Sequence, residues 1–193
     1  MPTILSICGS PAPISRTAHV LRAVDALLGC HGFDVVSVQV GALPAEALLH
    51  GDAEHPAIVR IADLLRHATG VVIGTPIYKA AYSGIVKSLL DVLPQRAFAR
   101  KGVLPLATGG SPAHMLALDY ALRPVLCAMG AEHIAAGRFI LERLVTMHPD
   151  GTVTLDVEAG ELLTRVTDDF AATLISGQRW ASATDRVAAT PSG

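Results

Sequence analysis

Short apolar runs alternate along the chain with longer segments in which apolar residues recur every three or four positions. The short runs predict strands at residues 3–8, 33–40, 70–74 and 102–107, with the last central strand within residues 132–139. The periodic segments predict helices at residues 16–28, 56–67, 83–93, 113–129 and 158–175. Strands that alternate with helices in this way indicate a parallel sheet covered by helices on both faces.

Towards the C-terminus the sequence contains a turn motif, and further on the apolar periodicity ends. The sequence HPDG at residues 148–151 predicts a hairpin between residues 144–147 and 152–155. Residues 177–193 are rich in Ser, Thr, Ala and Gly, and we expect them to form a flexible tail. A length of 193 residues suits one domain, which we expect to span residues 1–176.

The composition narrows the class of protein. Hydrophobic residues make up 51% of the chain and charged residues 17%, which excludes a disordered chain. The net charge is −2, aromatic residues make up 4%, and Lys and Arg form no dense run, so nucleic acid is not expected as a partner. The mean hydropathy of +0.45 is high for a chain of this size and favours a homo-oligomer, either a homodimer or a homotetramer.

Two further features bear on the compartment and on metal binding. No apolar run approaches the ~20 residues of a membrane helix, and the first residues carry no basic leader. We therefore expect no membrane span and a cytoplasmic location. Cys8, Cys30 and Cys127 are far apart and show no metal-ligand spacing, so we expect reduced thiols and no bound metal.

The loop after the first expected strand has the chemistry of an anion site. Its sequence, GSPAPISRT at residues 9–17, offers the hydroxyls of Ser10, Ser15 and Thr17 and the guanidinium of Arg16 at the start of a helix. Such donors, beside the free N–H groups of a helix start, suit a phosphate. The alternative is a plain loop in which Ser15 only caps the helix.

The loop after residues 70–74 is apolar and aromatic. Pro76 stiffens the backbone as it leaves the strand, and Ile77 and Tyr78 follow it. In parallel sheets, ligands bind at the carboxyl ends of the strands, so this loop suits a flat, partly apolar ligand. Tyr82, a few residues further on, either contacts such a ligand or packs under the next helix.

The loop after residues 102–107 contains a glycine pair. Thr108 is followed by Gly109 and Gly110, which permit close approach of the backbone to a ligand. The alternative is an ordinary turn before a helix capped by Ser111. All three loops are expected at the same edge of the sheet.

The three loops, in this order, resemble the NADPH-dependent FMN reductase family of flavodoxin-like proteins. The most specific segments are GTPIYKAAYSGIVKSLLDVLPQRA, GVLPLATGG and AHMLALDYALRPVL, at residues 74–97, 102–110 and 113–126. Within the family, they are most similar to the flavin reductases of two-component monooxygenase systems that use alkanesulfonates. The resemblance covers the chain to about residue 129 and, more loosely, to the last helix.

The resemblance implies a flavodoxin-like three-layer sandwich with a five-stranded parallel sheet of order 2-1-3-4-5. It also implies an enzyme that reduces FMN with NADPH, or with NADH, by hydride transfer. Because the cofactors supply this chemistry, no catalytic side chain is expected. Many members carry an arginine at the position of Ala12, so one phosphate contact of the family is absent here.

The resemblance also implies which residues hold the flavin. The phosphate would lie against the first loop and the isoalloxazine ring against the other two. The matching positions are Ser10, Ser15, Arg16, Thr17, Pro76, Ile77, Tyr78, Thr108, Gly109 and Gly110. Further candidate contacts of the flavin or the nucleotide are Lys79, Ser111 and His114.

Tyr120 and Pro124 lie four residues apart within the expected helix at residues 113–129. Because proline has no N–H, the Tyr120 carbonyl loses its helical partner, and a kink or π-bulge is expected. In the sulfonate-linked reductases, the matching tyrosine is associated with such a bulge at the subunit interface. The resemblance thus implies that Tyr120 influences self-association and flavin release; the alternative is an ordinary kink with Tyr120 in the core.

Several functions fit these residues. Either the enzyme supplies reduced FMN to a partner monooxygenase of sulfonate metabolism, or it retains FMN and reduces a quinone, azo dye or metal ion. A non-enzymatic flavodoxin-type electron carrier is disfavoured by the net charge of −2, because such carriers are strongly acidic. A cysteine phosphatase is disfavoured, because seven residues separate Cys8 from Arg16, whereas the C-x5-R loop of that class has five.

Overall fold

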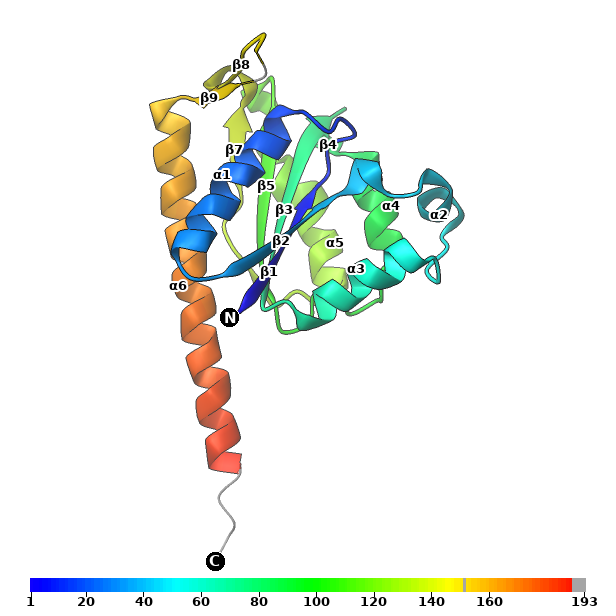
Figure 1. Cartoon of the computed structure of the whole chain (residues 1–193), viewed down its shortest axis with the longest axis vertical. Coiled ribbons are helices and arrows are strands. Elements are labelled where there is room, and N and C mark those ends of the chain that lie inside the picture. Colours follow the sequence, from blue (N-terminus) through cyan, green and yellow to red (C-terminus); the bar gives the residue numbers. More distant parts are fainter. Residues whose placement is uncertain (151, 189–193) are drawn as a thin grey trace, which may run out of the picture.

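A mostly parallel sheet forms the middle layer of the molecule (Figure 1). The structure, a computed structural model, describes residues 1–150 and 152–188, and the side chains of residues 1–150 and 152–177. The path of the sheet is formed by β1 (Thr3–Cys8), β2 (Asp34–Gln39), β3 (Gly70–Tyr78), β5 (Gly102–Gly109) and β6 (His133–Ile134). The strands lie in the order β2-β1-β3-β5-β6, and all these pairs are parallel. The expected flavodoxin-like order 2-1-3-4-5 is confirmed.

The fifth strand is divided into two pieces, which corrects the expectation of one strand at residues 132–139. β6 pairs with the start of β5, and β7 (Arg138–Leu141) pairs with its end. Pro105 of β5 lies between the residues that pair with β6 and those that pair with β7, and it has no N–H to donate to a neighbouring strand. A Cβ on Gly137 would lie 2.7 Å from the Pro105 carbonyl oxygen, so the break packs closely against the proline.

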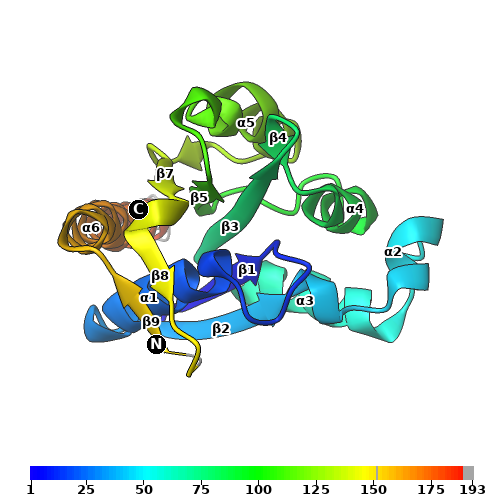
Figure 2. The same cartoon turned by 90° about the horizontal axis from the view of Figure 1, so that it is seen from above.

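Helices cover both faces of the sheet. Seen from above in Figure 2, α1 (Arg16–Cys30) and α6 (Val157–Ala188) lie on one side, and α4 (Gly84–Val92) and α5 (Arg123–Ala128) on the other. α3 (Pro56–His67) packs on the same side as α4. Alternate strand residues face alternate layers, so neighbours such as Ile4 and Leu5 belong to different cores.

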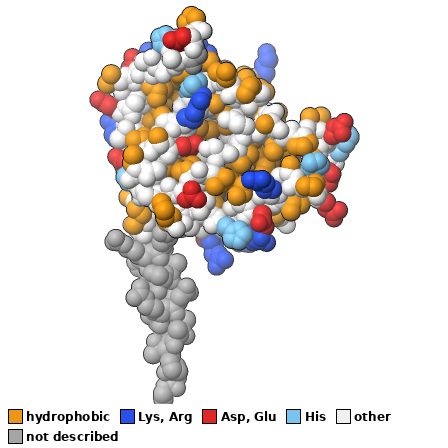
Figure 3. Space-filling model, in the orientation of Figure 1, with side chains coloured by type: hydrophobic (Ala, Val, Ile, Leu, Met, Phe, Trp, Pro, Cys, Tyr) orange, Lys and Arg blue, Asp and Glu red, His pale blue; other side chains and the backbone are white. Residues whose placement is uncertain are grey.

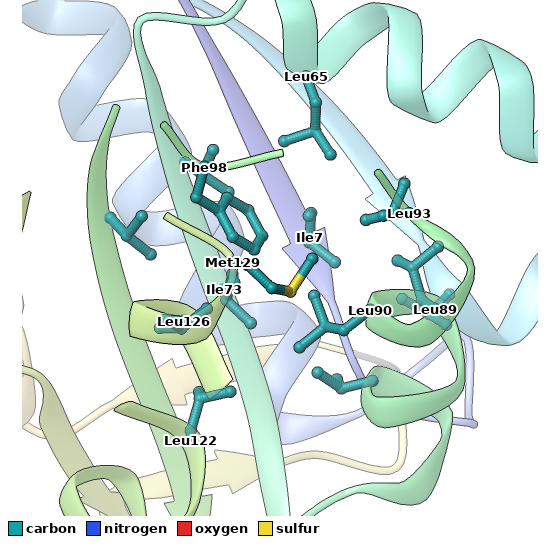
Figure 4. Packing of buried hydrophobic residues seen from close by; sticks show 14 of the residues in the cluster. Ile7, Leu65, Ile73, Leu89, Leu90, Leu93, Phe98, Leu122, Leu126 and Met129 are labelled. Carbon is teal, nitrogen blue, oxygen red and sulfur yellow. The ribbon is translucent and has the colours of Figure 1, made fainter. Parts of the chain in front are cut away.

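The core on the α4 side holds α4 against the sheet. In Figure 4, Ile7 and Ile73 of the sheet lie close to Leu89 and Leu90 of α4, and Phe98 lies above Met129. Burial of each such side chain contributes about 1.5–3 kcal/mol. This packing fixes α4 against the sheet, and the start of α4 in turn contacts the first loop.

The segment expected to form one helix at residues 113–129 consists of three pieces. A 3₁₀ turn covers Pro112–His114, a π-helix covers Leu118–Leu122, and α5 begins at Arg123. Pro124 explains the last break, because it has no N–H to bond the carbonyl of Tyr120. In the π-helix, hydrogen bonds reach five residues back instead of four, as from the N–H of Arg123 to the carbonyl of Leu118.

The C-terminal region holds the expected hairpin and a longer helix than expected. β8 (Val145–Met147) pairs antiparallel with β9 (Val153–Leu155). α6 continues to Ala188, through most of the segment expected to be a tail, and residues 189–193 lie outside the described residues. A short α2 (Ala45–His50) was not expected from the pattern. Across the described ranges, no helix is long and apolar enough to cross a membrane.

Candidate functional site

The loops after β1 and β3 are joined at the carboxyl edge of the sheet by short hydrogen bonds. The N–H of Gly9 donates to the carbonyl of Gly74 at 2.7 Å. The hydroxyl of Ser83, just before α4, donates to the carbonyl of Gly9 at 2.6 Å, and its N–H donates to Thr75 Oγ1 at 2.9 Å. Because these groups are buried, the bonds hold the first and second loops in one arrangement.

The third loop is tied to the first through two threonines. The hydroxyls of Thr17 on α1 and Thr108 at the end of β5 lie 2.7 Å apart, and both side chains are buried. Thr17 therefore links the first loop to the third. The structure thus brings together the three loops that the sequence singled out.

The hydroxyl pair predicts a double-mutant effect. Thr17→Val or Thr108→Val alone leaves one buried hydroxyl without its partner, which costs about 1–3 kcal/mol of unfolding free energy. Replacing both threonines removes the pair without leaving an unpaired hydroxyl. The double variant is therefore expected to lose less unfolding free energy than the two single variants together. Urea denaturation of the four proteins measures this. Strictly additive losses would contradict the contact.

The first loop presents hydroxyl and N–H donors at the start of α1. Ser15 caps the helix by accepting from the N–H of Ala18 at 3.1 Å, and Ser10 accepts from the N–H of Ala12 at 3.3 Å. Within residues 1–150 and 152–177, neither serine hydroxyl donates a hydrogen bond, so each keeps a proton to donate; Ser15 is half-buried and Ser10 is buried. In the first turn of α1, the N–H groups of Arg16 and Thr17 have no intrahelical partner, whereas that of Ala18 is bonded to Ser15. This donor set suits a phosphate.

Arg16 is held by a segment that lies far along the chain. Its Nε donates to the carbonyl of Val145 on β8 at 3.0 Å, and its Nη1 lies 3.9 Å from a carboxylate oxygen of Glu142. Both charged side chains are about two-fifths exposed (41% and 43%). Arg16 therefore lies between the first loop and the hairpin β8–β9. Reasoning from the sequence missed these two partners of Arg16.

The second loop forms a strained two-residue turn. β3 extends through Pro76 and Ile77, both buried, to Tyr78, and β4 (Ala81–Tyr82) turns back along it. Lys79 and Ala80 at the tip have φ angles of 50° and 65°. Side chains rarely adopt this left-handed backbone, and two such residues in succession are typical of a type I′ hairpin turn. Tyr120 Oη donates a hydrogen bond to the carbonyl of Ala80 and so links the π-helix to this turn.

Large apolar side chains are exposed around this turn and the π-helix. They are Tyr78, Met115, Leu116 and Tyr120, which are 52–64% exposed. Tyr120 thus lies on the surface of the chain rather than in the core. An aromatic and apolar surface beside the second loop suits a flat ring or a second copy of the chain.

In the third loop, the two glycines differ. A Cβ on Gly109 would lie 2.7 Å from the ring of Phe139, so this position is packed. A Cβ on Gly110 would meet only the Glu142 carboxylate, at 3.8 Å, so this position is open. Ser111 caps the following 3₁₀ turn by accepting from the N–H of Ala113, and His114 lies half-buried at the end of that turn.

Cys8 does not have the environment of a nucleophile. Its side chain is buried in the core between α1 and the sheet. Burial raises the pKa of the thiol above its ordinary value of 9.0. A reactive thiolate requires a lowered pKa, so the structure does not support a phosphatase site formed by Cys8 and Arg16.

The fold and the three joined loops define the class of protein, a flavodoxin-like flavoprotein oxidoreductase. The chain belongs to the NADPH-dependent FMN reductase family, whose model matches residues 2–144. FMN and NAD(P)H are thus the flavin and the electron donor of this enzyme.

Known relatives and solved structures agree with this class. Over 136 residues the chain is 48% identical to an "FMN reductase (NADPH)" of Pseudomonas putida, which covers 70% of this chain and 69% of that protein. It is 43% identical over 136 residues to an "FMN reductase (NADPH)" of Escherichia coli, with 70% and 71% covered. The crystal structure of the apo form of the NADH:FMN oxidoreductase EmoB superposes with a TM-score of 0.80 at 37% identity, and 90% of each chain is covered.

The class excludes a non-enzymatic electron carrier. The relatives at 43–48% identity are reductases. The net charge of −2 agrees, and on the face shown in Figure 3 basic and acidic side chains are mixed among apolar and uncharged groups. Electron carriers of the flavodoxin type carry a strongly acidic surface instead.

Proposed function

We propose that this FMN reductase binds its flavin weakly, reduces it with NAD(P)H and releases it to a partner monooxygenase, in a system that acts on sulfonates or other organosulfur compounds. The observation that carries the proposal is the sparse phosphate site. Arg16 is the sole side-chain cation of residues 9–17, where many family members have a second arginine at the position of Ala12. Arg16 also shares its donors with Val145 and Glu142.

In this proposal, the three loops hold different parts of the flavin. Ser10, Ser15, Arg16 and the first-turn N–H groups of α1 bind the phosphate. Tyr78, with Pro76 and Ile77 behind it, supports one side of the ring, and the backbone of Gly109 and Gly110 supports another. When bound, FMN accepts a hydride from the nicotinamide, so the chain supplies alignment rather than an acid or a base.

We propose that NAD(P)H, the electron donor, binds at the exposed side of this site. Lys79 is exposed at the tip of the second loop, and its ammonium group suits the 2′-phosphate that distinguishes NADPH from NADH. Ser111 caps the start of the 3₁₀ turn beyond Gly110, and His114 ends that turn. They are proposed as contacts of the nucleotide or of the flavin edge.

Self-association is the second part of the proposal. The exposed apolar surface formed by Tyr78, Met115, Leu116 and Tyr120 is proposed to be buried in a homodimer or homotetramer. In this arrangement, the π-helix lies between the subunit contact and the second loop, because Tyr120 bonds the carbonyl of Ala80. Subunit contact and flavin release are therefore proposed to be coupled.

Variants of Tyr120 test this coupling. Tyr120→Ala removes apolar contact area and the bond to Ala80, and we expect a smaller oligomer in light scattering and a changed affinity for FMN. Tyr120→Phe keeps the ring and removes only the hydroxyl, so it is expected to retain the oligomer. If Tyr120→Ala leaves both oligomer size and FMN affinity unchanged, the proposed interface is wrong.

The spectrum of the purified protein and its NADPH oxidation test the proposed function. We expect a nearly colourless protein whose NADPH oxidation saturates with added FMN. A yellow protein that retains FMN through gel filtration, and that oxidises NADPH only with an added quinone or dye, would instead indicate a reductase with a resident flavin.

A further inference from the structure

Glu142 lies at the meeting point of the first loop, the third loop and the hairpin β8–β9. It opens the 3₁₀ turn Glu142–Leu144 that follows β7 directly. One of its carboxylate oxygens lies 3.9 Å from Arg16 Nη1, and the same oxygen is the nearest neighbour of a Cβ placed on Gly110, at 3.8 Å. The carboxylate thus lies between the arginine of the first loop and the open glycine of the third.

We propose that Glu142 is a specificity-determining residue that weakens the hold of the site on the flavin phosphate and so makes the flavin releasable. The inference rests on the proposed function, in which Arg16 binds that phosphate. Without flavin, Glu142 pairs with Arg16; with flavin, the phosphate takes its place on the same guanidinium.

The geometry restricts what Arg16 can do for a phosphate. Its Nε is already bonded to the carbonyl of Val145, so only the Nη groups face an incoming anion. One of these, Nη1, faces Glu142. A phosphate on the Nη groups therefore lies within a few ångströms of the carboxylate, and the two negative groups repel one another.

The size of the effect follows from Coulomb attraction and repulsion in a wet site. Both side chains are about two-fifths exposed (41% and 43%), so solvent screens their charges strongly. A carboxylate about 5 Å from a doubly charged phosphate then weakens binding by about tenfold. An exposed ion pair of this kind contributes little to folding, so Glu142 can be replaced without loss of the fold.

A charge series at Glu142 tests the inference. Dissociation constants are measured by flavin fluorescence for FMN and for riboflavin, which has the same ring and no phosphate. Glu142→Gln is expected to tighten FMN binding about tenfold and Glu142→Lys to tighten it further, while riboflavin binding stays constant. In stopped-flow displacement, the dissociation rate of FMN is expected to fall in the same order.

A matched control and a second variant separate this inference from the proposed site. Glu132→Gln removes the same charge next to β6, at the opposite edge of the sheet, and is expected to change neither constant. If Arg16→Ala weakens FMN binding but Glu142→Gln leaves it unchanged, or tightens both flavins alike, the role of Glu142 is overturned and the site stands. If Arg16→Ala does not weaken FMN binding, the proposed phosphate site itself fails.

Discussion

Replacing Arg16 by alanine is expected to raise the dissociation constant for FMN by about 10- to 100-fold. A charge-assisted hydrogen bond to a phosphate is worth about 1.5–3 kcal/mol, and Arg16 is the sole side-chain cation of the first loop. Riboflavin binding is expected to stay constant, because riboflavin has no phosphate. Fluorescence titration with the two flavins measures both constants.

Two other variants sharpen this prediction. Arg16→Lys keeps the charge but lacks the planar guanidinium. Its dissociation constant for FMN is expected to lie between those of the wild type and of Arg16→Ala. Arg22→Ala removes an exposed arginine one to two turns further along α1, where it contacts His19, and serves as the matched control. Equal losses for FMN and riboflavin in Arg16→Ala would show that Arg16 does not act on the phosphate.

Gly9→Ala is expected to destabilise the protein and to weaken FMN binding at the same time. A Cβ at this position would lie 2.1 Å from Val86 Cγ2 and 3.1 Å from the carbonyl oxygen of Gly74, so α4 or the first loop must move. Overpacking of this kind costs about 1–3 kcal/mol. In a chain of this size, the melting temperature falls by about 2–4 °C per kcal/mol. FMN affinity is expected to fall as well, because Gly9 positions the first loop against the second.

A compensating variant and a control accompany this prediction. Val86→Ala removes the methyl group that clashes, so the double variant Gly9→Ala/Val86→Ala is expected to lose less stability than the sum of the single variants. Gly84→Ala, at the start of α4, meets nothing within 4 Å and is expected to be nearly neutral. Additive losses in the double variant would contradict the close packing of the first loop on α4.

The layers of the fold could be predicted because they follow from local patterns. Continuous apolar runs mark strands buried on both faces, and the helical periodicity marks the helices between them. The broken fifth strand could not be predicted in this way. Its break depends on Pro105 of the neighbouring strand, whose missing N–H acts only once the two strands lie side by side.

The loops of the site could be located from the sequence, but not the direction of each side chain. Ser15 caps the start of α1, as its place in the sequence suggested, and Ser10 lies in the first loop before the helix. Thr17 turns inward to bond Thr108, which lies 91 residues away in the sequence. The carbonyl that holds Arg16 belongs to Val145, 129 residues further along. A backbone carbonyl leaves no signal in the residue type, so no sequence pattern points to this contact.

The most direct measurement asks whether reduced FMN leaves the enzyme. The reductase is confined by a dialysis membrane under anaerobic conditions, with FMN and NADPH on both sides and cytochrome c only outside. If reduced flavin is released, the cytochrome outside is reduced at a rate that depends on FMN and on the enzyme. If the cytochrome is reduced no faster than without enzyme, although NADPH is consumed when cytochrome c and enzyme are mixed, the flavin stays bound and the enzyme does not release reduced FMN.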